Sequence, residues 1–387
     1  MFLSADPKDI LEGKITDVYF ERALAILKAK KINPVVKAEF IAKSLPKNWR
    51  WALLTGIGEA LELMKHLKIK TRALDEGMVF QPYQPVMEIE GRYQDFCVYE
   101  TALLGLICQA SGISTQAARL KKMAEDRLVM SFGARRMHPV LAPMIEWNAY
   151  VGGCDGVAVV KSGEVIGEDP MGTMPHSLIL CMGSTLEAIK AYDEVLDPKL
   201  KRVALIDTFQ DEKFEVLNVA QALGEKLYAV RFDTPGSRRG DFFRILEEAR
   251  WELDLRGLGH VKFFVSGGIT EEDIPVLNPV VHGYGIGTSI SNAPVIDFAM
   301  DIVEIDGLPI AKRGKWSGSK RVLACARCGL RRIVPNREQE NIACSCGGVF
   351  NDLLVPVLDH GKLLIVQDPP SRIRENVLRQ VKDLSLG

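Results

Sequence analysis

The sequence predicts an α/β protein with three parts: an α/β N-terminal domain, an irregular seven-stranded α/β barrel, and a small C-terminal insert with four clustered cysteines. Short apolar runs alternate with helical segments across 113–297, as parallel βα units do. A polar or glycine residue follows nearly every run, which is expected where strands end at one barrel mouth. We expect domains at 1–112, 113–297 and 323–387, with parts of 298–322 completing the first and a charged amphipathic helix over 371–384 ending the last.

Composition restricts the class of partner. Lysine and arginine number 49 against 50 aspartates and glutamates in 387 residues, for a net charge of −1. No basic field is available to attract nucleic acid or anionic lipid. A small-molecule partner, with no nucleic acid and no membrane, is therefore expected.

The distribution of apolar residues indicates a cytoplasmic protein. Acids stand near the N-terminus, where a secretory signal would place cations and then an apolar run. Apolar stretches such as 51–64 are interrupted by glycine and glutamate, so none is expected to span a membrane.

The first hundred residues predict a separate α/β domain. A helix should start at Thr16 or Asp17 and end at Lys31. Dense glycine and proline then surround a strand over 86–90, and an apolar helix follows over 96–111. We place the domain boundary at Gly112.

The central region predicts seven strands, one of them weak. Helical connections are expected over 143–152, 184–196, 214–223 and 244–255. Periodicity does not separate a closed barrel from an open doubly wound sheet, but the even distribution of polar strand ends favours the barrel. The strands are expected at 128–132, 156–160, near Met171, and at 203–206, 228–232, 261–265 and 280–286.

The last two strands end in glycine turns suited to phosphate. Ser266-Gly267-Gly268 offers successive backbone amides and a hydroxyl, and Gly285-Ile286-Gly287-Thr288 offers a second set. Barrel phosphate sites recur on the loops after the last two strands. Either motif alone can be an ordinary tight turn, but the pair predicts a phosphate site.

Polar residues after earlier strands are candidates for the same mouth. Arg135 and Arg136 follow the first strand and can bind carboxylate or phosphate oxygens, although paired arginines are often surface cations. Thr173 and His176 follow a turn, where a histidine is often a hydrogen-bonded core residue. Asp207 and Asp233 end two strands, where an aspartate often caps a helix.

The ordered set of motifs resembles the nicotinate phosphoribosyltransferase family, particularly its archaeal-type members. The resemblance covers nearly the whole chain. Its motifs are Thr16-Asp17-Val18-Tyr19, Phe132-Gly133-Ala134-Arg135-Arg136, Gly172-Thr173-Met174-Pro175-His176, Ile206-Asp207-Thr208, Val230-Arg231-Phe232-Asp233-Thr234 and the two glycine turns.

The resemblance implies a type II phosphoribosyltransferase that joins nicotinate to phosphoribosyl pyrophosphate, giving nicotinate mononucleotide and pyrophosphate for NAD synthesis. It also implies Mg²⁺, and coupling to ATP hydrolysis through a phosphorylated histidine, which by motif match is His176. A homo-oligomer with its active site near a dimer interface is expected, with Tyr19 stacking on the pyridine ring from a neighbouring subunit.

These expectations assign a role to each candidate residue. Departure of pyrophosphate leaves positive character on the ribose carbon, so cations are needed at the leaving group and acceptors at the sugar. The assignments are His176, Asp207 and Arg136 for catalysis; Tyr19, Phe132, Arg135, Arg136 and Thr173 for nicotinate; and Arg231, Asp233, Ser266, Gly267, Gly268, Gly285, Gly287 and Thr288 for phosphoribosyl pyrophosphate.

One loop departs from the family pattern. Many members have Asp-Ser-Gly-Asp after the Val-Arg strand, whereas this chain has a longer, more basic loop over 233–241. Ser237, Arg238 and Arg239 are candidates for binding pyrophosphate or ATP phosphate, with a solvated run of charge as the alternative.

The clustered cysteines predict a structural metal site. Cys325, Cys328, Cys344 and Cys346 form two close pairs, and each pair is followed by glycine, as in a zinc knuckle. Four thiolates leave no open coordination position, so structural Zn²⁺ is expected, ahead of iron. A nucleic-acid module would use the same ligands, but the net charge does not favour it.

Three other functions remain open. Quinolinate phosphoribosyltransferase shares the fold but needs a more basic pocket, and the Gly-Thr-x-x-His turn argues against it. Nicotinamide would need a neutral or acidic partner where a carboxylate needs arginine. A non-catalytic barrel that binds a phosphorylated metabolite, with the cysteine insert as an interaction module, is the third.

Overall fold

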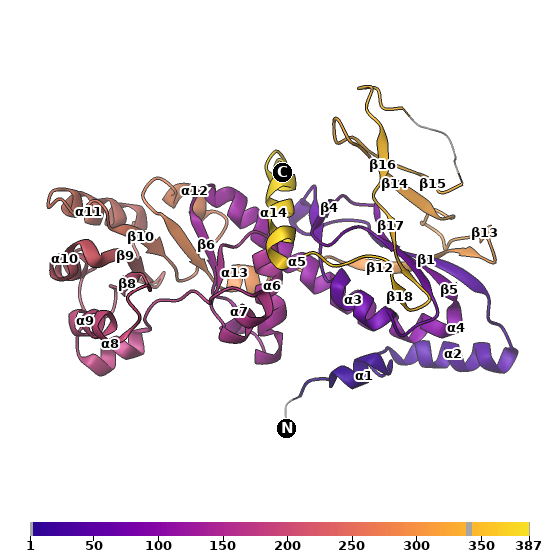
Figure 1. Ribbon diagram of the computed structural model, residues 1–387, viewed down its shortest axis with the longest axis horizontal. Helices are drawn as coiled ribbons and strands as arrows, with labels where there is room; N and C mark the ends of the chain where they lie inside the picture. Colours follow the sequence, from indigo (N-terminus) through magenta and orange to yellow (C-terminus); the bar gives the residue numbers. More distant parts are fainter. Residues whose placement is uncertain (1–2, 338–342, 387) are drawn as a thin grey trace. The chain divides into compact units, whose positions relative to one another are not determined.

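The computed structural model describes residues 3–337 and 343–386 (Figure 1). The chain forms two compact units. One consists of Met1–Thr115 with Pro294–Gly387, and the other of Gln116–Ala293. The C-terminal segment, with the cysteines and the last helix, thus belongs to the same unit as the N-terminus.

The first unit is built on an antiparallel seven-stranded sheet. A buried cluster that includes Phe40, Leu61 and Met87 fills its core. Helix α3 (Ile57–Met64) buries Leu61 in this cluster, while β2 (Ala52–Leu54) pairs with β4 (Met78–Phe80). The sheet order is β13 (Leu308–Pro309), β12 (Phe298–Ile305), β1 (Val35–Ala42), β5 (Pro85–Arg92), β3 (Lys70–Ala73), β17 (Val355–Asp359) and β18 (Lys362–Leu363).

The N-terminal helices agree largely with the sequence. Helix α1 (Pro7–Leu11) was not predicted, and α2 (Val18–Lys30) begins after Asp17 as expected. The predicted strand over 86–90 lies within β5. Two short turns, α4 (Tyr93–Phe96) and η2 (Cys97–Tyr99), precede the long helix α5 (Glu100–Ala124).

The prediction that a helix ends before Gly112 is wrong. Gly112 lies inside α5, and a Cβ atom there would approach the carbonyl oxygen of Pro294 to 2.2 Å. The glycine therefore allows another backbone segment to come close to the helix, and it does not break the helix.

One helical stretch of the described chain, Tyr93–Ala124, is long and apolar enough to cross a membrane by length and composition. We expected no stretch of this kind from the sequence. Half of the most apolar 18 residues of Tyr93–Ala124 are buried within the protein. Leu103, Ile107 and Ile113 are fully buried. A single stretch of this kind is weak support for a membrane span, because core helices pass the same test.

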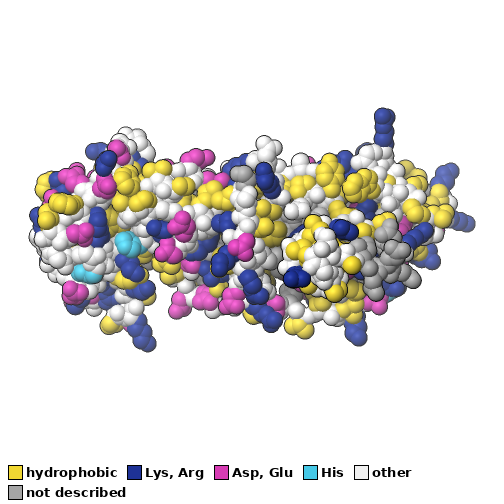
Figure 2. Space-filling model, turned by 90° about the horizontal axis from the view of Figure 1, so that it is seen from above, with side chains coloured by type: hydrophobic (Ala, Val, Ile, Leu, Met, Phe, Trp, Pro, Cys, Tyr) yellow, Lys and Arg dark blue, Asp and Glu magenta, His cyan; other side chains and the backbone are white. Residues whose placement is uncertain are grey.

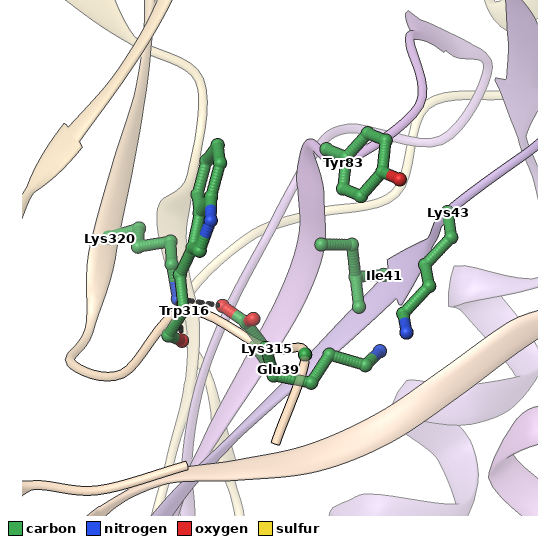
Figure 3. Close-up of a pocket in the computed structure, with 8 residues that line it drawn as sticks. Glu39, Ile41, Lys43, Tyr83, Lys315, Trp316 and Lys320 are labelled. Atoms are coloured by element: carbon green, nitrogen blue, oxygen red, sulfur yellow. Dashed lines mark hydrogen bonds and ion pairs between the residues drawn. The ribbon is translucent and has the colours of Figure 1, made fainter. Parts of the chain in front are cut away.

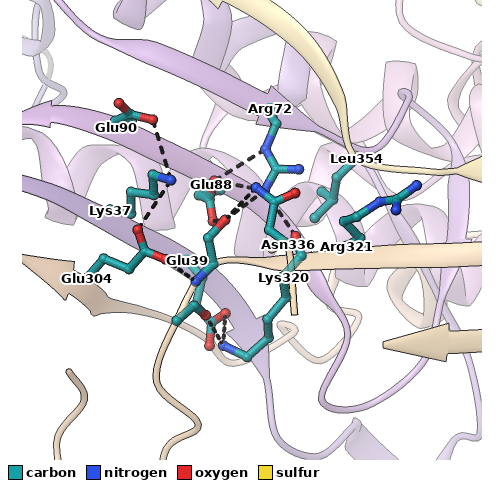
Figure 4. A network of polar contacts seen from close by, with 12 residues as sticks. Lys37, Glu39, Arg72, Glu88, Glu90, Glu304, Lys320, Arg321, Asn336 and Leu354 are labelled. Carbon is teal, nitrogen blue, oxygen red and sulfur yellow. Dashed lines mark hydrogen bonds and ion pairs between the residues drawn. The ribbon is translucent and has the colours of Figure 1, made fainter. Parts of the chain in front are cut away.

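A buried polar network joins β14 (Lys320–Cys325) to the large sheet (Figure 4). Lys320 Nζ lies 2.7 Å from Glu39 Oε2 on β1, and both side chains are almost fully buried. Ser319 Oγ donates to Glu88 on β5 at 2.6 Å, and Arg72 donates to the same carboxylate at 2.8 Å. Burial raises the pKa of Glu39, while Lys320 opposes the rise.

A small pocket borders this network (Figure 3). Its walls include the stacked rings of Tyr83 and Trp316, whose centroids are 6.3 Å apart. Lys315 also lines it and forms a buried ion pair with Asp301. The pocket is too narrow for more than about one water molecule.

The C-terminal segment forms a three-stranded antiparallel sheet and a final helix. Strand β14 is central, between β15 (Arg331–Pro335) and β16 (Phe350–Asp352). Helix α14 (Pro370–Val381), predicted over 371–384, buries Ile373 and Val377. A Cβ atom on Gly77 would meet both side chains within 3 Å, so glycine permits this close packing.

The second unit is a six-stranded parallel sheet in the order β7-β6-β11-β10-β9-β8. Helices α6, α9, α10 and α11 match the four predicted connections within two residues at each end. Their bounds are α6 (Ala142–Val151), α9 (Thr185–Val195), α10 (Glu212–Leu223) and α11 (Phe242–Asp254). The strands are β6 (Leu128–Ser131), β7 (Gly156–Val157), β8 (Arg202–Leu205), β9 (Leu227–Phe232), β10 (Lys262–Val265) and β11 (Gly283–Ile286).

The predicted seventh strand near Met171 is not a strand. Within the described residues, β7 and β8 remain the edges of the sheet, which is a half-barrel and not a closed barrel. Met171 donates one backbone hydrogen bond to Val157 at 2.7 Å, so its segment lies along β7. Pro170 and Pro175 flank it and lack the N–H groups that a ladder needs.

Charges are mixed on the face of the molecule shown in Figure 2. Lysine and arginine side chains are interspersed with aspartate and glutamate. This agrees with the near-zero net charge of the sequence.

We predict that Lys320→Met lowers the free energy of unfolding by about 3–5 kcal/mol, because it leaves Glu39 buried without its partner. Urea denaturation measures the change. The double variant Lys320→Met/Glu39→Leu should recover most of the loss, since neither charge then remains. A loss no larger than that of Lys190→Met, which removes an exposed ion pair with Glu187, would contradict the prediction.

Candidate active site

Three predicted residues meet at the carboxyl ends of β8 and β9. His176 begins α8 (His176–Met182), and its Nε2 lies 3.5 Å from Asp233 Oδ2 and 3.7 Å from Asp207 Oδ2. Its Nδ1 lies 3.0 Å from Thr208 Oγ1. The imidazole is thus held on one side by a hydroxyl and faces two carboxylates on the other.

Asp207 combines burial with an unused acceptor. Its side chain is 3% exposed, and Oδ1 has no hydrogen-bond partner. Burial raises the pKa of Asp207; His176 opposes this and the charge of Asp233 adds to it. A buried carboxylate oxygen without a partner is costly, so this atom is suited to a ligand hydroxyl or a bound water.

Neither carboxylate serves as the helix cap that the sequence left open. Asp211 caps α10 by accepting from the Lys213 N–H, and Asp241 caps α11 by accepting from the Arg244 N–H. Asp207 and Asp233 are therefore free for other roles.

Arg231 lies on β9 beneath this cluster. Its Nη1 donates to Thr173 Oγ1 at 2.7 Å, and Nη2 lies 4.0 Å from Asp233 Oδ2. Burial lowers the pKa of Arg231; Asp233 and Asp207 oppose this, and the charge of Arg135 adds to it. The Nε–H of Arg231 is buried without a partner, which leaves a donor available to an anion.

The turn after β10 has the backbone geometry that the sequence predicted. Gly267 and Gly268 have φ angles of 83° and 80°, which disfavour other residues. Ser266 Oγ donates to Asp233 Oδ1 at 2.6 Å, so the turn is joined to the carboxylate cluster. A Cβ atom on Gly267 would also lie 3.0 Å from the Asp233 carbonyl oxygen.

Arg239, a candidate for phosphate binding, is hydrogen-bonded to the backbone in the structure. Its guanidinium donates to the carbonyl oxygens of Thr234 at 2.8 Å and Ser266 at 2.7 Å, and also to that of Gly267. Arg239 thereby ties its own loop to the glycine turn. Ser237 and Arg238 in the same loop are exposed.

The second glycine turn is shaped by contacts with the end of β6. A Cβ atom on Gly285 would lie 2.3 Å from the Phe132 ring, and one on Gly133 would lie 2.5 Å from the Gly287 carbonyl oxygen. Thr288 begins the short helix α13 (Thr288–Ser291) and is exposed. Glycine at these positions allows the ends of β6 and β11 to approach each other.

The remaining predicted residues make no described hydrogen bond or ion pair with the cluster around His176. Arg135 and Arg136 form η3 (Ala134–Arg136) and are exposed, and neither makes an ion pair with a described residue. Tyr19 belongs to the other compact unit, where it is 57% exposed on α2 and donates its hydroxyl to Asp17 at 3.1 Å.

Sequence reasoning gave no role to Thr208. The residue belongs to the Ile206-Asp207-Thr208 motif, but only the structure places its hydroxyl against His176. A hydroxyl directly after a strand-end aspartate was the signal that could have indicated it.

The four cysteines converge as a zinc site requires. Their Sγ atoms all lie within 4.8 Å of one another, and Cys325–Cys346 and Cys328–Cys344 are each separated by 3.5 Å. Tetrahedral Zn–S bonds of ~2.3 Å imply sulfur separations of about 3.8 Å. Backbone hydrogen bonds, from Cys328 first and also from Arg327, lower the pKa of Cys325 to about 6.

The glycines after each pair perform the predicted turns. Gly329 and Gly347 have φ angles of 71° and 79°, and their N–H groups donate to the carbonyl oxygens of Cys325 and Cys344. A Cβ atom on Gly348 would lie 2.6 Å from Cys325 Sγ. The donor set and its backbone fit a structural metal ion.

Comparison with family sequence models assigns the class of protein. The model of the quinolinate phosphoribosyl transferase N-terminal domain matches residues 17–111, and that of the C-terminal domain matches residues 113–301. The chain therefore belongs to the quinolinate phosphoribosyl transferase family, which agrees with its parallel half-barrel.

Individual relatives carry two kinds of name. A crystal structure of nicotinate-nucleotide pyrophosphorylase from Pyrococcus furiosus is 47% identical and covers 99% of both chains, with a TM-score of 0.97. The human nicotinic acid phosphoribosyltransferase shares the fold at 19% identity, with a TM-score of 0.77 over 96% of this chain and 94% of that one. A nicotinate phosphoribosyltransferase of Mycobacterium tuberculosis is 27% identical over 79% of this chain and 76% of its own length.

We predict that Gly267→Ala lowers the free energy of unfolding by about 1–3 kcal/mol, because alanine is strained at positive φ and its Cβ atom would crowd Asp233. Urea denaturation measures the effect. Gly236→Ala is the matched control, since a Cβ atom there meets nothing within 4 Å and its φ is not positive. Equal midpoints for the two variants would show that the turn is not held in this conformation.

We predict about one zinc ion per purified chain, bound by the four thiolates. Elemental analysis should show loss of the metal in Cys328→Ser and its retention in Cys181→Ser, whose thiol is exposed and lies outside the cluster. Chelation should also lower the melting temperature of the wild-type chain, because metal binding contributes to folding. Equal metal content in the two variants would exclude the cluster as the binding site.

Proposed function

We propose that the protein is a nicotinate phosphoribosyltransferase that transfers phosphoribosyl from phosphoribosyl pyrophosphate to nicotinate and releases pyrophosphate. The observation that carries the proposal is the contact chain His176–Asp233–Ser266, which joins a histidine, a carboxylate and a glycine-rich turn at the carboxyl ends of adjacent strands. Relatives named nicotinate phosphoribosyltransferase support this choice of acceptor.

In this proposal the two glycine turns hold the ribose 5′-phosphate. The backbone amides of Gly267 and Gly268 and the hydroxyl of Ser266 serve one side, and Gly285, Gly287 and Thr288 the other. Arg239 keeps the first turn in shape through its hydrogen bonds to carbonyl oxygens. Ser237 and Arg238, which are exposed, and Arg239 in the same loop are the candidates for binding pyrophosphate or ATP phosphate.

The two carboxylates of the site are proposed to interact with the ribose while its bond to pyrophosphate breaks. As pyrophosphate leaves, positive charge develops on the ribose carbon, and Asp207 and Asp233 stabilise it and accept from the ribose hydroxyls. Arg231, with its free Nε–H, binds the departing anion. Mg²⁺, when bound, would neutralise pyrophosphate charge, and the unpartnered Oδ1 of Asp207 fits a water in its coordination sphere.

The proposal assigns nicotinate to the cationic end of β6. Arg135 and Arg136 are exposed without ion-pair partners among the described residues, so one can bind the pyridine carboxylate. Phe132 and Thr173 contribute to the same pocket, with Arg136 also acting in catalysis. Tyr19, on an exposed helix, would come from a neighbouring subunit of a homo-oligomer.

ATP coupling through His176 is a further part of the proposal. The contact between Nδ1 and Thr208 fixes the ring, and Nε2 is the nitrogen that faces the two carboxylates. Nε2 is therefore the atom proposed to accept a phosphoryl group. We further propose a cytoplasmic location and a structural role for the zinc-binding segment.

Quinolinate is the second candidate substrate. The matching family models carry its name, and the Pyrococcus neighbour is named nicotinate-nucleotide pyrophosphorylase. A quinolinate enzyme must recognise two carboxylates and lose one as carbon dioxide. Arg135, Arg136 and Arg231 give enough positive charge to keep this candidate open.

We predict that purified protein with phosphoribosyl pyrophosphate and Mg²⁺ releases pyrophosphate with nicotinate and much less with quinolinate or nicotinamide. ATP should increase the rate. Product analysis by mass spectrometry, with and without ATP, distinguishes the substrates. If no pyridine carboxylate supports pyrophosphate release, the enzyme proposal is rejected, and release with quinolinate alone would reject nicotinate.

In the same assay, His176→Ala should abolish ATP stimulation and leave measurable basal transfer. His260→Ala, an exposed histidine whose ring contacts only the Gly224 carbonyl oxygen in the described hydrogen bonds, is the matched control. Undiminished ATP stimulation in His176→Ala would exclude the phosphohistidine role.

A further inference from the structure

A second pocket lies at the opposite end of the parallel sheet from the candidate active site. It measures about 490 Å³. Lys201 and Tyr228 lie where β8 and β9 begin, Lys262 begins β10, and His282 directly precedes β11. In such folds the carboxyl ends of strands carry chemistry and the amino ends serve stability, so a large cationic pocket here needs a separate explanation.

Two ammonium groups of this pocket contact the same side chain, Tyr228, and the acid that lines the pocket, Asp126, is paired with Arg127. Lys262 Nζ lies 3.2 Å from the Tyr228 hydroxyl and 4.9 Å from its ring centre, and Lys201 Nζ lies 4.3 Å from the same ring centre. Neither lysine makes an ion pair within the part of the chain that the structure describes. Two positive charges around one tyrosine, with no described ion-pair partner, favour a bound anion.

The pKa values of two neighbouring side chains are shifted by nearby positive charges. Burial would raise the pKa of Tyr228, but the hydrogen bonds and the positive charges of Lys262 and Lys201 together lower that pKa. Burial, with the charges of Arg250, Lys262 and Arg127, lowers the pKa of His282. Arg127 is the only one of the lining cations whose charge is balanced by described acids, namely Glu125 and Asp126.

The pocket is separate from the candidate active site within the same unit. Between the two ends of the sheet lies an apolar cluster made of Met130, Val203, Ala229 and Phe264. A Cβ atom on Gly283 would lie 3.0 Å from the Phe264 ring, so this side chain fills the interior. A ligand in the second pocket thus would not occupy the cluster around His176.

We propose that this pocket binds a phosphate-bearing anion of nucleotide size, with its phosphate groups between Lys201 and Lys262. The volume is within the range of small-molecule sites, and Leu128, Val280 and Val281 supply apolar wall for the remainder of the ligand. Phosphate is favoured over a single carboxylate because two or more cations can share its oxygens.

The binding test uses a chain whose first glycine turn is blocked by Gly267→Val, so that phosphate at the candidate active site does not contribute. Titration calorimetry with ATP and with pyrophosphate should show one site per chain in this background. Adding Lys201→Met/Lys262→Met should weaken binding at least tenfold. Adding Lys161→Met/Lys190→Met, which removes two exposed lysines of the same unit, should leave it within twofold.

Comparing ATP, pyrophosphate and adenosine shows which part of the ligand the pocket recognises. Binding of ATP but not pyrophosphate would identify a nucleotide, and equal binding of both would show that the phosphate groups suffice. Adenosine should not bind. Absence of any binding in the blocked chain, or equal affinity in the two double variants, would overturn the proposal.

A second measurement uses the unaltered protein, in case the pocket variants fold poorly. An amine-reactive reagent followed by mass spectrometry should modify Lys201 and Lys262, and saturating ATP should reduce this at least fivefold. Lys199, exposed and outside the pocket, should react equally with and without ATP. Unchanged reactivity of Lys201 and Lys262 would reject the site.

Discussion

The parallel register of β8, β9 and β10 is the constraint on which the candidate active site depends. Leu205 pairs with Arg231, and Val265 pairs with Phe232, so the three strands end at nearly one level. The ladder continues for one more bond at each junction, from Ile206 N–H to Arg231 and from Ser266 N–H to Phe232. Residues directly after these bonds are therefore neighbours, although they are separated by whole helices in the sequence.

Much of this arrangement could be predicted because the informative residues directly follow strands. Apolar runs located six parallel strands, and the rule that parallel strands share one carboxyl edge placed Asp207, Asp233 and Ser266 together. The metal site of the four cysteines could be predicted for a similar reason, because the spacing of each pair and the glycine that follows it are local features of the sequence. The contact of His176 with both carboxylates fits the same reasoning, because α8 starts at that edge.

The predictions that failed depended on contacts that leave no local signal. Gly112 was expected to follow the end of a helix, but the helix is continuous there and the missing side chain lets the backbone of Pro294 approach it. The hydrogen bonds from the Arg239 guanidinium to carbonyl oxygens of two loops also have no local sequence signal, and its role in phosphate binding stays a prediction. The run near Met171 had the composition of a weak strand, and its flanking prolines limit it to a single backbone bond with Val157. The roles given to Arg135, Arg136 and Tyr19 stay predictions.

Asp233 uses its two oxygens for different partners, Oδ1 for Ser266 and Oδ2 for His176 and Arg231. A ligand that takes the Ser266 hydroxyl as a donor removes one hydrogen bond from this carboxylate and increases the negative charge that it presents to the imidazole. A negative group on the imidazole would, in turn, disfavour that charge. Occupancy of the turn and the chemical state of the histidine are thus energetically linked through one side chain, and the linkage must be equal in both directions.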